Sequence, residues 1–402
     1  THASNSATYT PKVRCDGLLA LAVFCLSEII IGFVVFAHSV MKDLGERWKA
    51  RLTERVDHAV IRGLSRFGKH YSEYVSRSLR LVEEQGPATT GFFRPDLDNV
   101  YVDVRVSPEA PQLVPTGLVA EMIADDPQKR RNLQEFINQS VPSVLAVVGA
   151  PGSGKTTLLR KTALDICKKS KARRDVPLLL YLRDHVTLIV QDPQVDIVTL
   201  VRRHLERFRV EDPPGWFDRR LRAGKCVVLL DGLDEVADEA DRRAVSEWVG
   251  HQVDKYHKND FVITSRPQGY LTAKVDKALV LKVQPFTSDQ TTRFVHRWYE
   301  AIESRAAGVG DDAVMLRAAA AANDLLDRLD NTPALYELTV NPLLLTMIVN
   351  VHRYRGALPG RRVDLYGEIC EVMLWRRQEV KNWRLKWAAT RRKRCCDCSP
   401  TR

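Results

Sequence analysis

One stretch of this 402-residue chain has the residue types and spacing needed to hold phosphate: Gly149-Ala150-Pro151-Gly152-Ser153-Gly154-Lys155-Thr156. Glycines allow backbone N–H groups to close around phosphate oxygens, and the N-terminus of a following helix adds positive potential. Lys155 is then expected to reach the β- and γ-phosphates of a nucleotide, and Thr156 to offer its hydroxyl to Mg²⁺. The residues assigned to nucleotide binding here are Gly149, Pro151, Gly152, Ser153, Gly154, Lys155, Thr156 and Thr157.

A cluster of acidic residues further along the chain can supply a second metal ligand and a group that acts on water. Asp231 follows the apolar run Val227–Leu230 and is expected to hold Mg²⁺ together with Thr156. Asp234 or Glu235, directly downstream, can orient or deprotonate an attacking water. The alternative is an acidic turn that caps a helix. Because the acidic residues lie downstream of a phosphate loop, the catalytic interpretation is favoured.

A basic residue completes the candidate catalytic set. Arg266 ends the apolar run 260–266, beside Thr264 and Ser265. From there its guanidinium is expected to contact the γ-phosphate and to report whether that phosphate is present. The alternative is an ordinary exposed arginine at the end of a strand.

These residues can act together only if the segments that carry them end at the same edge of a sheet. Apolar runs typical of buried strands alternate with helical patterns along the chain. Such alternation predicts an α/β fold, with a parallel sheet flanked by helices and joined by right-handed crossovers, and with ligands at the carboxyl ends of the strands. The expected strands are 144–148, 176–182, 226–231, 260–266 and 279–283, and the expected helices are 157–164, 195–208, 214–223 and 237–253.

The sequence patterns of two further regions predict that one pairs with this sheet and that the other packs on it. Residues 100–106 alternate strictly between apolar and polar side chains, which predicts a strand that joins the edge of the sheet. Residues 287–351 are mostly helical and predict a small helical domain packed on the sheet. This domain could change its angle with the state of the nucleotide, and the alternative is a helical cap with no moving part.

The N-terminal part contains an apolar run of 24 residues from Gly17 to Val40, interrupted by Glu28 and His38. That length is enough to span a bilayer as a helix, and a carboxylate within it is tolerated when protonated or paired. More basic residues follow the run than precede it, which places the rest of the chain in the cytoplasm. We expect a single-pass membrane anchor with a cytoplasmic NTPase, and the alternative is a buried helix of a soluble cytoplasmic protein.

The net charge of +11 is concentrated in two segments. Residues 42–80 carry ten basic and five acidic residues, and residues 384–402 carry seven basic and one acidic, so the remainder is balanced. A basic groove through the core is not indicated, and nucleic acid is therefore not an expected partner. Residues 41–81 also show one apolar helical face, and their basic face either lies on anionic lipid or is a solvated face packed on the next domain.

Four sequence blocks, in this order, resemble the NACHT domain, a branch of the STAND class of AAA+-related P-loop NTPases, in a bacterial type with an N-terminal membrane segment. The blocks are Val147–Thr157, Leu229–Val236, Ile263–Pro267 and Leu338–Leu345. The resemblance extends over about 140–377 and implies a molecular switch, with a resting ADP form, an ATP form that self-associates, and slow hydrolysis. It also implies that Arg266 is the sensor and that Pro342 approaches the adenine.

The resemblance also predicts how the chain ends. Leu365–Arg377 resembles the start of the winged-helix segment that follows in such proteins, and we expect this segment to be truncated. The complete expected order is a disordered N-terminus at 1–16, a transmembrane helix at 17–40, a basic amphipathic helix at 41–82, a linker with one strand at 83–115, the nucleotide-binding domain at 116–285, a helical lid domain at 286–356, the truncated winged-helix segment at 357–384 and a basic Cys-containing tail at 385–402.

The function that these residues indicate is a membrane-anchored NTPase that uses ATP/ADP and Mg²⁺ in a signalling switch, with bacterial defence as the role suggested by the family. The role in signalling and defence rests on analogy with the family, since a fold does not determine a function. The alternative is a nucleotide-binding membrane scaffold that does not hydrolyse ATP. A transport or motor ATPase is disfavoured, because the chain shows no second phosphate loop and no substrate domain.

Overall fold

The computed structural model divides the chain into two units after Arg66, and the described residues all belong to the second unit. The structure describes residues 67–80, 95–108, 130–137, 139–168, 175–206, 212–307 and 312–381, with the backbone alone at 305–307 and 372–381. The expected segments 1–16, 17–40 and 385–402, and most of 41–82, therefore lie outside the described residues. Within the described ranges, no helix combines the length and the apolar character that a membrane crossing requires.

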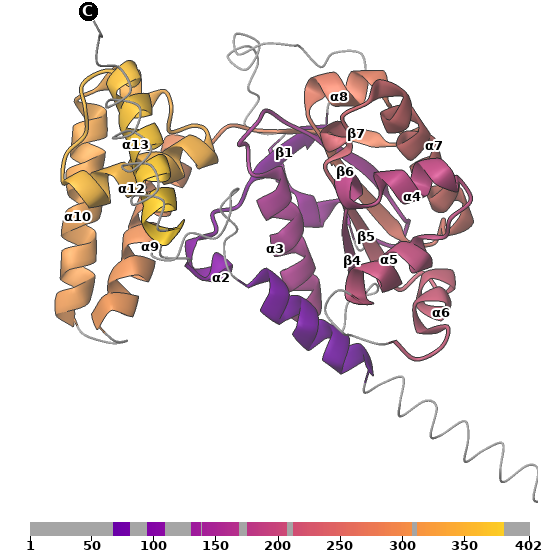
Figure 1. Cartoon of the computed structure of the whole chain (residues 1–402). Helices are drawn as coiled ribbons and strands as arrows, with labels where there is room; N and C mark the ends of the chain where they lie inside the picture. Colours follow the sequence, from indigo (N-terminus) through magenta and orange to yellow (C-terminus); the bar gives the residue numbers. More distant parts are fainter. Residues whose placement is uncertain are drawn as a thin grey trace, which may run out of the picture. The chain divides into compact units, whose positions relative to one another are not determined.

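The described residues form one seven-stranded sheet, in the order β2-β1-β7-β3-β6-β5-β4. Figure 1 shows this sheet with β1, β4, β5, β6 and β7 labelled. Strands β7, β3, β6, β5 and β4 run parallel to one another, which confirms the predicted parallel sheet. Strands β1 and β2 extend one edge in antiparallel fashion. The strands are β1 (Arg105–Pro108), β2 (Arg131–Asn132), β3 (Val144–Val148), β4 (Val176–Tyr181), β5 (Cys226–Asp231), β6 (Asp260–Ser265) and β7 (Leu279–Val283).

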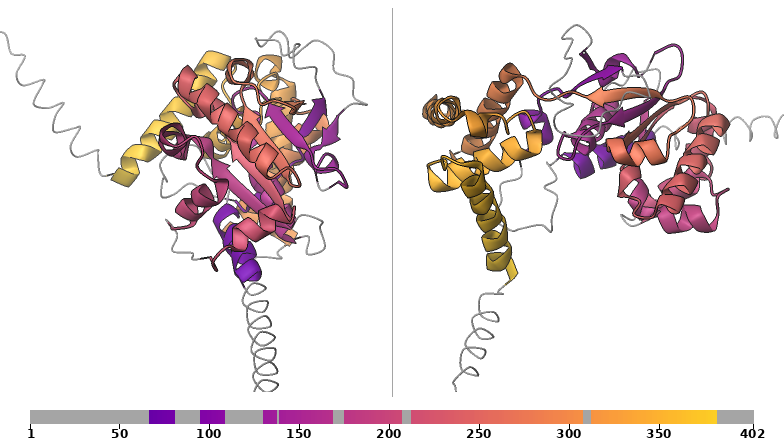
Figure 2. Two further views of the ribbon diagram at one scale, coloured as in Figure 1. Left: turned by 90° about the vertical axis from the view of Figure 1, so that its right-hand side faces the viewer. Right: turned by 90° about the horizontal axis from the view of Figure 1, so that it is seen from above.

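Helices cover both faces of the parallel strands. Every residue of β5 and of β6 is buried, as expected for central strands that are packed on both sides. Figure 2 shows the helices on either side of the strands. These helices are α3 (Lys155–Lys168), α4 (Val186–Gln191), α5 (Ile197–Glu206), α6 (Trp216–Arg222), α7 (Glu239–Lys255) and α8 (Pro267–Thr272), with short 3-10 turns η3 (Leu133–Glu135), η4 (Leu182–Asp184) and η5 (Leu233–Glu235).

The strand predicted at 100–106 is wrong in its bounds. A helical turn, α2 (Leu97–Val100), capped by the Asp96 carboxylate, occupies the start of that segment, and the strand β1 begins only at Arg105. Between them, side chains of the helical domain bind the main chain: Gln290 donates to the Asp103 carbonyl at 2.6 Å, and Arg297 donates to the Tyr101 carbonyl. The alternation therefore marks residues that are buried without strand pairing, while β1 pairs with β7 at the edge of the sheet as expected.

The helical residues 67–79 pack on the nucleotide-binding domain. Phe67, Tyr71 and Val75 lie on one face and are all buried. The Phe67 ring lies 4.9 Å from that of Trp216 in α6, and the Tyr71 hydroxyl donates to the Pro177 carbonyl in β4 at 2.7 Å. For this part of the predicted helix, the apolar face packs on the next domain.

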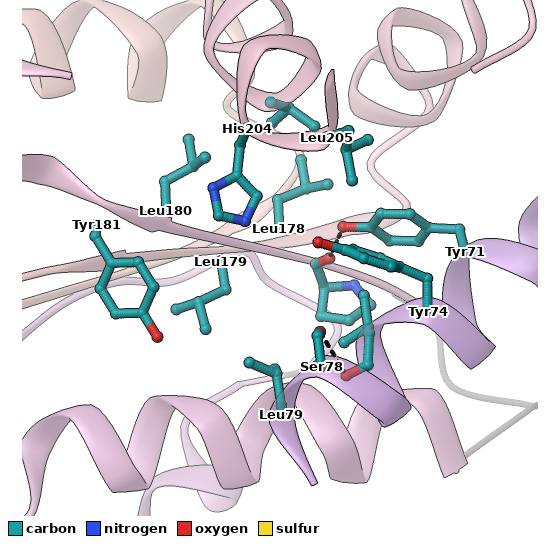
Figure 3. Close-up of a pocket in the computed structure, with 13 residues that line it drawn as sticks. Tyr71, Tyr74, Ser78, Leu79, Leu178, Leu179, Leu180, Tyr181, His204 and Leu205 are labelled. Carbon is teal, nitrogen blue, oxygen red and sulfur yellow. Dashed lines mark hydrogen bonds between the residues drawn. The ribbon is translucent and has the colours of Figure 1, made fainter. Parts of the chain in front are cut away.

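A small pocket of about 40 Å³ lies where residues 67–79, β4 and α5 meet (Figure 3). Its lining is mostly apolar, with Leu178, Leu179 and Leu180 of β4 on one side and Tyr71 and Tyr74 on the other. The residues assigned to nucleotide binding do not line this pocket.

Five helices follow the sheet in the described residues and confirm the predicted helical region. The first four, α9 to α12, are called the helical domain below. Asn341 caps α12 with its side chain, Pro342 occupies the first turn, and Gly356 ends the helix with φ +67°. The helices are α9 (Ser288–Ala307), α10 (Asp312–Asp330), α11 (Pro333–Tyr336), α12 (Pro342–Arg355) and α13 (Arg362–Lys381), the last of which covers the expected start of a winged-helix segment.

One hydrogen-bonded chain of side chains joins three helices of this domain. Tyr299 of α9 lies 2.6 Å from Nδ1 of His352 in α12, and Nε2 of His352 lies 2.9 Å from Asp324 in α10. Tyr299 and His352 are buried, and burial lowers the pKa of the His352 imidazole. The neutral ring therefore accepts from the Tyr299 hydroxyl and donates to the Asp324 carboxylate.

Candidate nucleotide-binding site

The phosphate loop connects the end of β3 to the start of α3, as the sequence predicts. Gly152 and Gly154 have φ of +76° and +86°, which favours glycine at both positions. The Gly149 amide donates to the Ser265 carbonyl at 3.2 Å, so the loop is also fixed to the end of β6. The first turn of α3 contains Lys155, Thr156 and Thr157.

Lys155 lies within the loop. Its ammonium donates to the carbonyls of Gly149 at 2.7 Å and Ala150 at 3.0 Å. Burial lowers the pKa of Lys155, while the nearby Asp234 carboxylate acts in the opposite direction. A desolvated ammonium held at the centre of the loop is suited to bind the oxygens of a polyphosphate.

The two expected metal ligands lie side by side. The Thr156 hydroxyl donates to Asp231 Oδ2 at 2.8 Å, which brings the start of α3 to the end of β5. The Thr264 hydroxyl of β6 donates to the other carboxylate oxygen and accepts from the Gly232 amide at 2.9 Å. Burial raises the pKa of the Asp231 carboxyl, and the hydrogen bonds from Thr264 and Thr156 lower it.

Asp234 is bound to the expected sensor residue. Its carboxylate accepts the Arg266 backbone N–H at 2.9 Å and pairs with the Arg266 Nε at 2.9 Å. A Cβ added to Gly269 would lie 2.5 Å from the Asp234 Cβ, so α8 packs tightly on this acid. Only 11% of the Asp234 side chain is exposed. Asp234 therefore joins the end of β5 to the end of β6.

Glu235 has a different partner, which the sequence analysis did not single out. Arg183, in the turn after β4, donates from Nη1 to Glu235 Oε2 at 2.7 Å. The Arg183 guanidinium also lies 5.5 Å from the centre of the Tyr181 ring. Because β4 is next to β5 on the side opposite β6, this ion pair holds Glu235 on the far side of β5 from Arg266. About a quarter of the Glu235 side chain is exposed, compared with 54% of Arg183.

The first turn of α12 lies against the phosphate loop. The Asn341 side-chain amide donates to the Pro151 carbonyl at 3.0 Å, and the Leu343 amide donates to the Gly152 carbonyl at 3.3 Å. A Cβ added to Gly154 would lie 4.0 Å from the Pro342 ring. Pro342, the residue expected near the adenine, is therefore next to the loop.

The donor set fits a nucleotide with Mg²⁺. The Ser153 hydroxyl oxygen is buried, and no partner is found for it among the described residues. Glycines with positive φ leave room for close approach of phosphate. Thr156 and Asp231 provide the oxygen ligands that Mg²⁺ prefers. The residues that would hold the nucleotide and the ion are thus assembled at one edge of the sheet.

The structure brings most of the predicted residues together and adds three that were missed. The phosphate loop, Asp231, Asp234, Arg266 and Pro342 are linked by the contacts above, whereas Glu235 is bound toward β4. Thr264, Arg183 and Asn341 were not assigned roles. The signal for Arg183 was available, because it follows a buried strand in the same way that Asp231 and Arg266 do.

Comparison with known protein families identifies part of the chain. Residues 143–301 match the family described as the NACHT domain. This match confirms the NACHT resemblance over those residues, which contain the phosphate loop, the acidic group after β5 and Arg266. No curated protein matches the chain.

Solved structures that are similar to part of this chain include the following two. Domain III of the replication initiation protein DnaA from Thermotoga maritima is 14% identical, with a TM-score of 0.30, covering 59% of this chain and 85% of that one. Cdc6p from Pyrobaculum aerophilum is 15% identical, with a TM-score of 0.30, covering 56% of this chain and 60% of that one.

Proposed function

Because residues 143–301 match the NACHT domain, we propose that this chain binds ATP with Mg²⁺, hydrolyses it slowly and acts as a signalling switch. The observation that carries the proposal is the 2.8 Å contact between Thr156 and Asp231. Mg²⁺ bound there would neutralise charge on the β- and γ-phosphates. Lys155 binds the same phosphates, and Arg266 reports the γ-phosphate.

Lys155→Ala tests nucleotide binding. Removing the ammonium should weaken ATP binding by at least about tenfold, because a charged hydrogen bond contributes roughly 1.5–3 kcal/mol. Titration with a fluorescent ATP analogue measures the affinity. Lys168→Ala, at the exposed end of the same helix, is the matched control and should bind as the wild type does. Equal affinities of wild type and Lys155→Ala would exclude the loop as the phosphate site.

Hydrolysis separates the switch from the competing scaffold function. We assign Glu235 to the attacking water, because Arg266 binds both carboxylate oxygens of Asp234, whereas the bond from Arg183 uses only Oε2 of Glu235. Wild type should release phosphate slowly, and Glu235→Gln should bind ATP normally while losing turnover. If neither protein releases phosphate while both bind ATP, the chain is a non-hydrolysing nucleotide-binding scaffold.

Self-association, a membrane anchor and a role in bacterial defence complete the proposal. The family resemblance supports self-association in the ATP state, and light scattering with ATP and with ADP would measure it.

The apolar run at 17–40 supports a single-pass anchor with the NTPase in the cytoplasm. Deleting residues 1–41 should move the protein from the membrane to the soluble fraction. Full-length protein that is soluble without detergent would refute the anchor.

A further inference from the structure

A single side chain of the helical domain forms hydrogen bonds both to its own helix and to the phosphate loop. Asn341 Oδ1 accepts the amides of Leu343 at 3.0 Å and Leu344 at 3.3 Å, which caps α12. Its Nδ2 donates to the Pro151 carbonyl at 3.0 Å. Both ends of this amide are therefore used, and they join segments 190 residues apart.

The contact with Pro151 determines the direction of one amide in the loop. The carbonyl of Pro151 and the N–H of Gly152 belong to the same planar trans peptide, so they point in opposite directions. Because Asn341 holds the carbonyl toward α12, the Gly152 N–H points away from α12. A backbone N–H directed in this way is a donor available to phosphate.

The next peptide of the loop is held at both ends. The Gly152 carbonyl accepts the Leu343 amide at 3.3 Å, and the Ser153 amide donates to the Ala150 carbonyl at 3.2 Å. The fit is close, since a Cβ added to Gly152 would lie 2.7 Å from Asn341 Oδ1 and 2.9 Å from the Leu343 Cβ. The first turn of α12 therefore helps to fix this conformation of the loop.

We propose that Asn341 is a positioning residue for phosphate binding, which couples the phosphate loop to the helical domain. It acts through the Gly152 amide and contacts no phosphate itself. The proposal rests on the function proposed above, because it concerns the same nucleotide. Docking of α12 raises the affinity for phosphate, and by linkage a bound nucleotide stabilises the docked position of α12 to the same extent.

Asn341→Asp separates the two roles of the side chain. Aspartate caps a helix about as well as asparagine does, but it has no N–H to donate to Pro151. We expect α12 to remain folded by circular dichroism, and fluorescent ADP to bind about fivefold more weakly, mainly through faster dissociation. That factor corresponds to the loss of one hydrogen bond of ordinary strength.

Two controls isolate the contact. Asn331→Asp removes a similar bond, 2.8 Å from Nδ2 to the Asp327 carbonyl, at the end of α10. It should leave the affinity for ADP unchanged. Asn341→Ala loses both the cap and the contact without adding a negative charge near the phosphates, so it should also weaken ADP binding. Wild-type affinity in Asn341→Ala would show that Asn341→Asp acts by charge repulsion alone and would refute the inference. Hydrogen exchange on ADP addition should slow in the first turn of α12 in the wild type and not in Asn341→Asp.

The outcomes distinguish this inference from the proposed function. If wild type binds ADP, Lys155→Ala does not, and Asn341→Asp releases ADP at the wild-type rate, the role of Asn341 is refuted while the nucleotide site stands. If the wild type binds no nucleotide, the proposed function fails and the inference fails with it. Equal weakening by Asn331→Asp and Asn341→Asp would also refute the inference.

Discussion

The two neighbouring acids after β5 are bound by different arginines, and this difference predicts different effects of substitution. Glu235→Gln should lower kcat at saturating ATP by about 10²-fold or more, as expected for loss of a general base. Asp234→Asn should lower kcat by less than tenfold, because its amide oxygen can still accept the Arg266 N–H. Phosphate-release assays measure both, and a loss in Asp234→Asn as large as in Glu235→Gln would reverse the assignment.

The roles of residues in motifs with a fixed local spacing could be predicted from the sequence. The roles of residues that reach the site through tertiary contacts could not. Thr156 and Asp231 follow directly from a glycine loop and an apolar strand. The partner of Glu235 depends on which strand lies beside β5, and the sequence does not specify that order. Asn341 lies within the block Leu338–Leu345, but its contact with Pro151 depends on how the helical domain packs.

Among the helices, the chain of hydrogen bonds from Tyr299 through His352 to Asp324 predicts a pH dependence. Burial lowers the pKa of His352 below its usual value of about 6.5. The unfolded chain therefore binds more protons than the folded one near that pH, and stability is lost as the pH falls through about 6.5. Arg328 and His352 hold the pKa of Asp324 below its usual range, so its own contribution is lost only at lower pH.

Thermal unfolding at pH 7.5 and 5.5 measures this effect. Wild type should lose more stability on acidification than His352→Gln, which has no imidazole to protonate. The substitution itself should destabilise the protein at pH 7.5, since it disturbs the bonds to Tyr299 and Asp324. Equal losses on acidification in the two proteins would contradict the role of His352.

Elements with an unbroken apolar run were predicted closely, because burial on both faces leaves little choice of structure. The predicted bounds of β3, β5 and β7 agree with the structure. The segment 100–106 was different, since its alternation suits a strand while Asp96 caps a helical turn and α9 binds the main chain that follows. Tertiary contacts there outweigh the local pattern.

On the scale of the whole molecule, nucleotide should stabilise the fold by mass action. Mg-ATP at about 100 times its Kd should add about 2.7 kcal/mol to the free energy of unfolding. Differential scanning fluorimetry should show a rise of several degrees in Tm with ATP and Mg²⁺. The rise should be smaller with EDTA and in Thr156→Ala. A Tm shift that is the same with and without Mg²⁺ would argue against the ion site at Thr156 and Asp231.

The packing of residues 67–79 on β4 also affects how copies of the protein can associate. An uncovered edge strand is a template on which another chain can add a strand. At the β4 edge, Pro177 has no N–H to offer, and the Tyr71 hydroxyl already occupies its carbonyl. At the opposite edge of the described sheet, β2 is only two residues long. Both features disfavour strand addition at the edges of the described sheet. If the protein self-associates as proposed above, we expect the contacts to be made by helices and loops, without a sheet that continues from copy to copy.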